Sequence, residues 1–198
     1  MRIIRYTAWA AIAALLLAIA LIVTPGNRTA DLAAKPGLDI GGPFTLTTHE
    51  GKRLSSEALK GKPFAIFFGF TYCPDICPGT LLEVTQSIAA LGKDADKMRF
   101  LFVTVDPERD TPEQLALYLS NFDARIIGLT GTPEEIASVA KAYRIIYEKV
   151  PGKDDYTMNH TALVYLMDAK GELGGVIAYG LPAEMRLKKL RELVGVAE

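Results

Sequence analysis

Residues 69–78, G-F-T-Y-C-P-D-I-C-P, join a short apolar run to the start of an amphipathic helix. The run at 64–70 (FAIFFGF) is typical of a strand buried on both faces, and residues 75–91 predict a helix with a broad apolar face. A helix N-terminus lowers the pKa of a nearby thiol. Cys73 and Cys77 are four positions apart, so on a helical turn their Cβ atoms would lie about 5–6 Å apart. Two sulfurs in that arrangement can hold one metal ion or close a small disulfide.

Along the rest of the chain, strands alternate with helices. We expect a β-hairpin around Glu50-Gly51, strands at 98–105 and 125–129, helices at 112–122 and 132–143, a hairpin of 160–168 with 173–178, and a final helix at 182–194. Alternation of this kind indicates a sheet covered on both faces. The order of the elements resembles that of a thioredoxin-like domain. We therefore expect an α/β fold with a central mixed sheet flanked by helices.

The N-terminus carries a separate signal. Residues 7–23 contain no charged side chain, and as a helix they would extend roughly 26 Å, close to the hydrocarbon thickness of a membrane. Arg2 and Arg5 precede the run and predict a cytoplasmic N-terminus. We expect a single-pass transmembrane anchor at 1–25, a linker at 26–42, and a domain at 43–196 on the periplasmic side of the inner (cytoplasmic) membrane. A cleaved signal peptide is the alternative, and either interpretation places the domain in an oxidising compartment.

The composition excludes several classes of function. A net charge of −1 provides no basic excess, so we expect no nucleic-acid partner. No G-x-x-x-x-G-K phosphate loop is present, which argues against a nucleotide enzyme. A domain of about 150 residues buries a sufficient core without a metal or a disulfide. The two cysteines are therefore not needed for stability, which favours a chemical role for them.

The number of donors narrows the choice of metal. Structural zinc takes four N or S ligands, whereas this chain has two cysteines and two histidines. Two thiolates with one imidazole suit Cu(I), which accepts low coordination. His49 falls in the predicted hairpin turn at 47–52, and we interpret it as a solvated turn residue.

His160 is the better candidate ligand. It begins the predicted strand at 160–168, after a polar loop at 147–159. In thioredoxin-like domains the loop before this strand faces the dithiol, so we expect the imidazole to point at the cysteines. We also expect the loop to be mobile without metal and ordered by copper.

Other interpretations of the cysteine pair stay open. A structural disulfide would close a loop of only five residues, 73 to 77, and would constrain the unfolded chain little. A redox-active dithiol without metal would make the chain a thiol–disulfide oxidoreductase that reduces partner cysteines. A peroxidase is a third alternative.

Three motifs together resemble the Sco/SenC family of copper-binding, thioredoxin-like proteins: T-Y-C-P-D-I-C-P at 71–78, V-D-P-E-R-D-T-P at 105–112 and N-H-T at 159–161. The resemblance covers residues 42–194. It implies that Cys73, Cys77 and His160 bind one copper ion, Cu(I) or Cu(II), and that the two cysteines can also form a redox disulfide. It further implies that the chain delivers copper to the binuclear copper A site in subunit II of cytochrome c oxidase, or prepares the thiols of that site. A copper donor and a thiol reductant would be the other partners.

Three acidic residues in these motifs have candidate roles. Asp106 follows the predicted strand at 98–105, and by resemblance it lies near the metal, behind the ligands or in contact with a partner. Asp75, between the cysteines, can favour the helix N-terminus electrostatically or contact a partner. Asp110 and Thr111 are explained by capping of the helix at 112–122.

Overall fold

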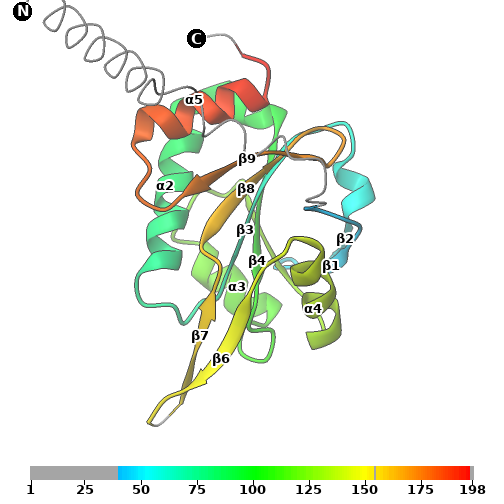
Figure 1. The fold of residues 1–198 in the computed structure, drawn as a ribbon, viewed down its shortest axis with the longest axis vertical. Coiled ribbons are helices and arrows are strands. Elements are labelled where there is room, and N and C mark those ends of the chain that lie inside the picture. The colour runs from blue at the N-terminus through cyan, green and yellow to red at the C-terminus, as the bar shows by residue number, and fades with distance from the viewer. Residues whose placement is uncertain (1–39, 154, 197–198) are drawn as a thin grey trace, which may run out of the picture. The chain divides into compact units, whose positions relative to one another are not determined.

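The computed structural model describes residues 40–153 and 155–196. Within them, a seven-stranded mixed sheet has the strand order β2-β1-β5-β4-β3-β8-β9, and β6 pairs with β7 alone (Figure 1). The strands are β1 Thr45–Thr48, β2 Arg53–Ser55, β3 Phe64–Gly69, β4 Arg99–Thr104, β5 Ile126–Thr130, β6 Tyr147–Pro151, β7 Tyr156–His160, β8 Leu163–Met167 and β9 Leu173–Ala178. The helices are α2 Ile76–Leu91, α3 Pro112–Leu119, α4 Pro133–Ala142 and α5 Ala183–Leu193, with 3-10 turns η1 Ser56–Leu59 and η2 Gly92–Lys97.

The centre of the sheet is parallel. β3 pairs in parallel with β4, and β4 with β5, while β8 joins the other side of β3 in the antiparallel direction. All six residues of β3 are buried, because helices cover both faces of the sheet and leave no polar face for alternation. The predictions of a buried strand at 64–70 and of a mixed α/β fold are therefore confirmed.

Alternating side chains of β3 define the two covered faces. Phe67 packs on Phe102, whose ring lies 6.0 Å from that of Tyr118 in α3. On the opposite face, Phe68 packs against Tyr143, which follows α4, at a ring distance of 5.5 Å. Helices α2 and α5 contact each other (Figure 1). The two layers fix β3 firmly, and the chain leaves that strand directly into the cysteine segment.

Helices α3 and α4 begin where side chains satisfy free backbone N–H groups. Thr111 accepts from the Gln114 amide at the start of α3. Thr132 and Glu135 form a reciprocal capping box at the start of α4, and a proline occupies the first turn of both helices. These local signals explain why the sequence located both starts correctly.

The segment that precedes β8 differs from the prediction. Residues 147–159 were expected to be a polar loop, but β6 and β7 pair as an antiparallel ribbon that extends away from the seven-stranded sheet (Figure 1). His160 is the last residue of β7, and the next strand begins at Leu163 rather than at His160. The loop interpretation failed because the ribbon buries one residue, Met158, and so carries almost no hydrophobic alternation.

The predicted N-terminal anchor at 1–25 and most of the predicted linker at 26–42 lie outside the described residues. Across residues 40–153 and 155–196, none of the helices combines the length and the apolar character that crossing a membrane requires.

Candidate metal centre

The two cysteines lie where β3 passes into α2. Cys77 is in the first turn of α2 and is fully buried, whereas Cys73 lies in the preceding loop and is half-buried. The backbone N–H of Cys77 donates to the Sγ atom of Cys73 at 3.4 Å. A helix N-terminus thus faces the Cys73 sulfur, and its free N–H groups stabilise a thiolate there. Neither cysteine forms a disulfide bond in this structure.

His160 reaches the cysteines from the end of β7. Its Nε2 atom lies 3.4 Å from the Sγ of Cys77, and its Nδ1 atom lies 3.0 Å from the backbone oxygen of Thr161. A carbonyl oxygen only accepts, so Nδ1 carries the ring proton and the lone pair of Nε2 faces the sulfur. The rings of Phe70 and Phe67 meet the imidazole edge-on at 5.8 and 6.2 Å. The ring is therefore held in an orientation that suits a metal ligand.

The three predicted ligand residues come together in one cluster. One ligand atom from each of Cys73, Cys77 and His160 lies within 4.8 Å of the other two. In the part of the chain that the structure describes, this group has no fourth member, whether histidine, cysteine or carboxylate. Two sulfurs and one imidazole are a soft, three-donor set, which fits copper and falls short of the four ligands of structural zinc.

The two thiols differ in acidity. The Cys77 side chain donates a hydrogen bond to Cys73, and the backbone N–H groups of Asp75 and Cys77 add to this effect, so the pKa of Cys73 lies far below its usual range. The same hydrogen bond to Cys73, together with burial, raises the pKa of Cys77. The metal-free pair therefore consists of one accessible thiolate and one buried thiol.

Gly69 allows the close packing around Cys77. A Cβ atom at this position would lie 2.9 Å from the Cys77 Sγ and 2.8 Å from the Phe102 ring. Both distances are shorter than side chains tolerate, so only glycine fits between β4 and the sulfur without displacing one of them.

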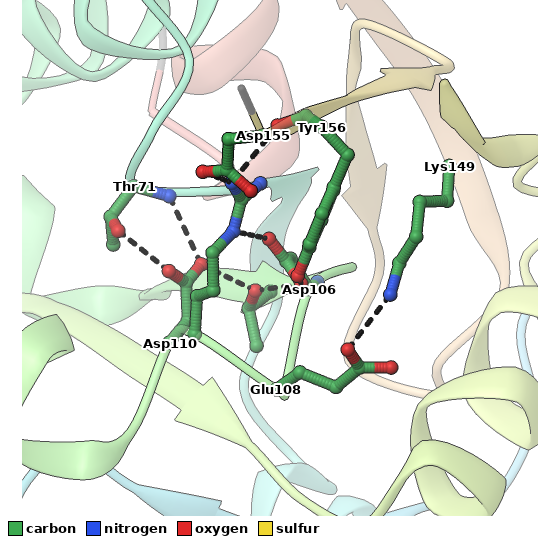
Figure 2. Close-up of polar contacts among 9 residues, drawn as sticks. Thr71, Asp106, Glu108, Asp110, Lys149, Asp155 and Tyr156 are labelled. Atoms are coloured by element: carbon green, nitrogen blue, oxygen red, sulfur yellow. Dashed lines mark hydrogen bonds and ion pairs between the residues drawn. The ribbon is translucent and has the colours of Figure 1, made fainter. Parts of the chain in front are cut away.

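Asp110 ties the cysteine loop to β4, a role that the sequence did not reveal. It is fully buried and accepts hydrogen bonds from the Thr71 N–H, the Thr71 hydroxyl and the Thr104 hydroxyl, at 3.0, 2.6 and 2.6 Å (Figure 2). Thr111 alone caps α3, so the capping interpretation of Asp110 is wrong. Burial raises the pKa of Asp110, although the three donors oppose that effect.

Asp106 lies behind the ribbon that carries His160. It is buried and accepts from the Tyr156 hydroxyl at 2.8 Å and from the Arg109 Nε at 2.5 Å (Figure 2). Burial removes it from direct contact with a partner. It touches none of the three ligand residues in these contacts, and it connects β4 to the ribbon instead. Burial, together with the hydrogen bond that the Tyr156 hydroxyl donates to Asp106, raises the pKa of Tyr156 to about 12.

Asp75 and His49 complete the set of predicted residues. Asp75 precedes α2, is exposed, and makes no side-chain capping bond, so it remains open to a partner. His49 lies in the expected turn, but it is half-buried and its Nδ1 accepts from the Gly128 N–H at 3.0 Å. The interpretation of His49 as a solvated residue is therefore wrong, because it extends the contact between β1 and β5.

The sequence of the chain also matches those of known proteins. The sequence model of the SCO1/SenC family matches residues 33–195. The chain belongs to the SCO1/SenC family. Protein SCO2, mitochondrial, of Saccharomyces cerevisiae is 41% identical over 159 residues, which are 78% of this chain and 53% of the yeast protein. The SCO1 homologue of Homo sapiens is 43% identical over 138 residues, 67% of this chain and 46% of the human protein. The chain thus spans about half the length of these curated relatives.

Solved structures of Sco proteins share the fold. Bradyrhizobium japonicum ScoI with copper bound matches with a TM-score of 0.74 and 50% identity, over 78% of this chain and 99% of that one. BsSco, described as a member of the Sco family of cytochrome c oxidase assembly proteins with a disulfide switch, matches with a TM-score of 0.66 and 27% identity, over 82% of this chain and 98% of that one.

Proposed function

We propose that this chain is a copper metallochaperone that binds one Cu(I) or Cu(II) ion through Cys73, Cys77 and His160. The observation that carries this proposal is that the three ligand atoms lie within 4.8 Å of one another. Two soft sulfur donors and one imidazole nitrogen form a ligand set that suits copper. The orientation of Nε2 toward Cys77 supports the proposal, as does the copper bound by the Sco protein of Bradyrhizobium japonicum.

Metal analysis of the full chain tests copper binding. The reduced protein is loaded with Cu(I), separated from free ion and analysed. We expect one copper per chain for the wild type and for His49→Ala, which removes the histidine outside the cluster. We expect no retained copper for the triple variant Cys73→Ser/Cys77→Ser/His160→Ala. Equal copper in the triple variant and the wild type would refute the site.

The destination that we propose is the binuclear copper A site in subunit II of cytochrome c oxidase. Copper is the cargo, and it moves by ligand exchange. Cys73 and His160 are half-buried while Cys77 is fully buried. Incoming thiolates or imidazoles therefore replace Cys73 and His160 first, and Cys77 releases the ion last. The description of BsSco as a member of the Sco family of cytochrome c oxidase assembly proteins supports this destination.

Delivery has its own test. The copper-loaded chain is mixed with metal-free subunit II, the two are separated, and copper is measured in each. Transfer to subunit II supports delivery. Retention of copper on the chain would reject delivery and leave the proposal of copper binding intact.

We further infer a periplasmic domain anchored by residues 7–23, which protease treatment of intact spheroplasts would test.

A second candidate function is thiol–disulfide exchange, and the unequal thiols favour it. The Cys73 thiolate would attack a partner disulfide, forming a mixed disulfide and releasing one partner thiolate. Cys77, after losing its proton, would attack the Cys73 sulfur, closing the Cys73–Cys77 disulfide and releasing the second. A thiol reductant must then reopen this disulfide before copper can bind again.

His160→Ala separates the two functions. If copper binding dominates, the variant loses copper affinity and still reduces a small aromatic disulfide at nearly the wild-type rate. Loss of both activities would mean that His160 also serves the dithiol chemistry. Retention of full copper affinity would reject the three-donor site.

A further inference from the structure

The β6–β7 ribbon that carries His160 is joined to the rest of the domain by few contacts. Its strands hydrogen-bond to each other and to no strand of the seven-stranded sheet, and Met158 is the one buried side chain in them. A lone two-stranded ribbon is at best marginally stable in water. The position of the His160 imidazole therefore depends on what holds the ribbon against the domain.

Arg109 makes the largest set of polar contacts to the ribbon among the described residues. Its Nη1 donates to the Tyr156 carbonyl at 2.9 Å and to the Asp155 carboxylate at 3.0 Å. Its guanidinium carbon lies 3.7 Å from the centre of the Tyr156 ring, within cation–π range. Its Nε donates to Asp106, which follows β4, and the Asp106 carboxylate itself accepts from the Tyr156 hydroxyl (Figure 2).

The same guanidinium also contacts the cysteine loop. Its carbon lies 4.6 Å from the centre of the Tyr72 ring, and Tyr72 directly precedes Cys73. Tyr72 is 56% exposed, whereas the Arg109 side chain is only 15% exposed. One side chain therefore touches both segments that supply the cluster: the loop before α2 and the ribbon before His160.

We propose that Arg109 is a positioning residue that latches the His160 ribbon to the Cys73 loop and so holds the three donors together. This inference rests on the proposed copper site for its effect on the metal, although the latch itself is a property of the metal-free protein. Arginine suits the role because its planar fork stacks on aromatic rings and donates in several directions at once. A lysine would keep the charge beside Asp106 and lose the stacking and most of the hydrogen bonds.

Hydrogen exchange of the reduced, metal-free full chain tests the latch directly. In Arg109→Ala we expect the amides of 147–160 to exchange at least about tenfold faster, since charged hydrogen bonds that oppose local opening are lost. Amides of β3 and β4 should be unchanged. Arg53→Ala is the matched control, because Arg53 lies in β2 at one edge of the seven-stranded sheet and bonds to Glu135, Thr47 and Thr45, none of which belongs to the ribbon. It should leave the ribbon unchanged.

Copper affinity then tests how Arg109 acts. We expect Arg109→Ala to weaken Cu(I) binding about tenfold in the wild-type background and to have no effect in the His160→Ala background, as coupled residues do. Arg109→Lys should restore part of the affinity. If the alanine variant does not fold, the lysine variant takes its place in both measurements. Unchanged ribbon exchange in Arg109→Ala, or an equal loss of affinity in both backgrounds, would overturn the latch. If the wild type binds no copper, the proposed function fails while the exchange result still decides the latch.

Discussion

The Nε2 atom of His160 lies 3.4 Å from the Sγ atom of Cys77, although 83 positions separate the two residues. The contact joins the first turn of α2 to the end of β7, a strand that pairs only with β6. It exists because β3 directs the chain toward the cysteines while the ribbon returns the chain to the same edge.

The two histidines should have opposite tautomers in the metal-free protein. In His160 the Thr161 carbonyl requires a proton on Nδ1. In His49 the Gly128 N–H requires a lone pair on Nδ1, so the proton is on Nε2. Long-range 1H–15N spectra of the reduced chain measure the tautomer of each ring directly. An Nε2–H tautomer at His160 would mean that its lone pair does not face Cys77.

Alkylation should distinguish the two thiols. Because the pKa of Cys73 is far below its usual range and that of Cys77 is raised, iodoacetamide should modify Cys73 first. The Cys73 rate should stay nearly constant from pH about 5 to 9, whereas an ordinary thiol with a pKa of about 8.5 slows tenfold per pH unit on acidification. Peptide mapping after a short pulse measures both sites.

Two variants check the cause of that difference. Cys77→Ala removes the hydrogen-bond donor and should shift the Cys73 profile toward that of an ordinary thiol. Cys77→Ser, whose hydroxyl can still donate, should retain part of the effect. Equal modification of both cysteines in the folded wild type, with an ordinary pH profile, would contradict the thiolate assignment.

Gly69→Ala should destabilise the fold by about 1–3 kcal/mol, because the new methyl group would overlap the Cys77 sulfur and the Phe102 ring. Urea unfolding monitored by circular dichroism measures the change. Gly175→Ala in β9 is the matched control, since a Cβ atom there meets nothing within 4 Å, and it should change stability by less than about 1 kcal/mol. Similar losses in both variants would indicate a general cost of adding a methyl group to these strands.

The sequence predicted the sheet and its helices because their signals are local. The run at 64–70 is apolar throughout, and Thr111 and Thr132 each precede a proline at a helix start. The β6–β7 ribbon was missed because one buried residue, Met158, gives no periodic pattern. Its polar composition looked like that of a loop.

The cysteine pair was predictable from residue type and spacing, and His160 from the order of the elements and the family resemblance. The residues that hold these candidate ligands in place were not predictable. Asp110 stands directly before Thr111, so the capping pattern appeared to explain both, while its partner Thr71 is 39 positions away. Arg109 and Tyr156 are 47 positions apart, and no short-range pattern connects them. Contacts across such separations are set by the tertiary fold, which one sequence does not display.

Asp110 should be replaceable by asparagine but not by alanine. An asparagine oxygen can accept from the Thr71 N–H and the Thr104 hydroxyl, while its amide donates to the Thr71 hydroxyl. Alanine leaves these buried groups without a partner, so Asp110→Ala should lower the free energy of unfolding by about 2–4 kcal/mol. Urea unfolding compares the two variants. A loss as large in Asp110→Asn as in Asp110→Ala would show that the negative charge itself is required.

The comparison of wild type with Asp110→Asn should also depend on pH. Burial raises the pKa of Asp110 in the folded state above its ordinary value of 3.8, so the folded protein binds this proton more tightly than the unfolded chain. The resulting stabilisation is fully present below pH 3.8 and is lost as pH rises through the folded-state pKa. The free energy of unfolding of the wild type, relative to Asp110→Asn, should therefore fall across that window and level off above it. A difference that increases with pH would mean that the three hydrogen bonds from Thr71 and Thr104 outweigh burial, and that Asp110 prefers its charged form.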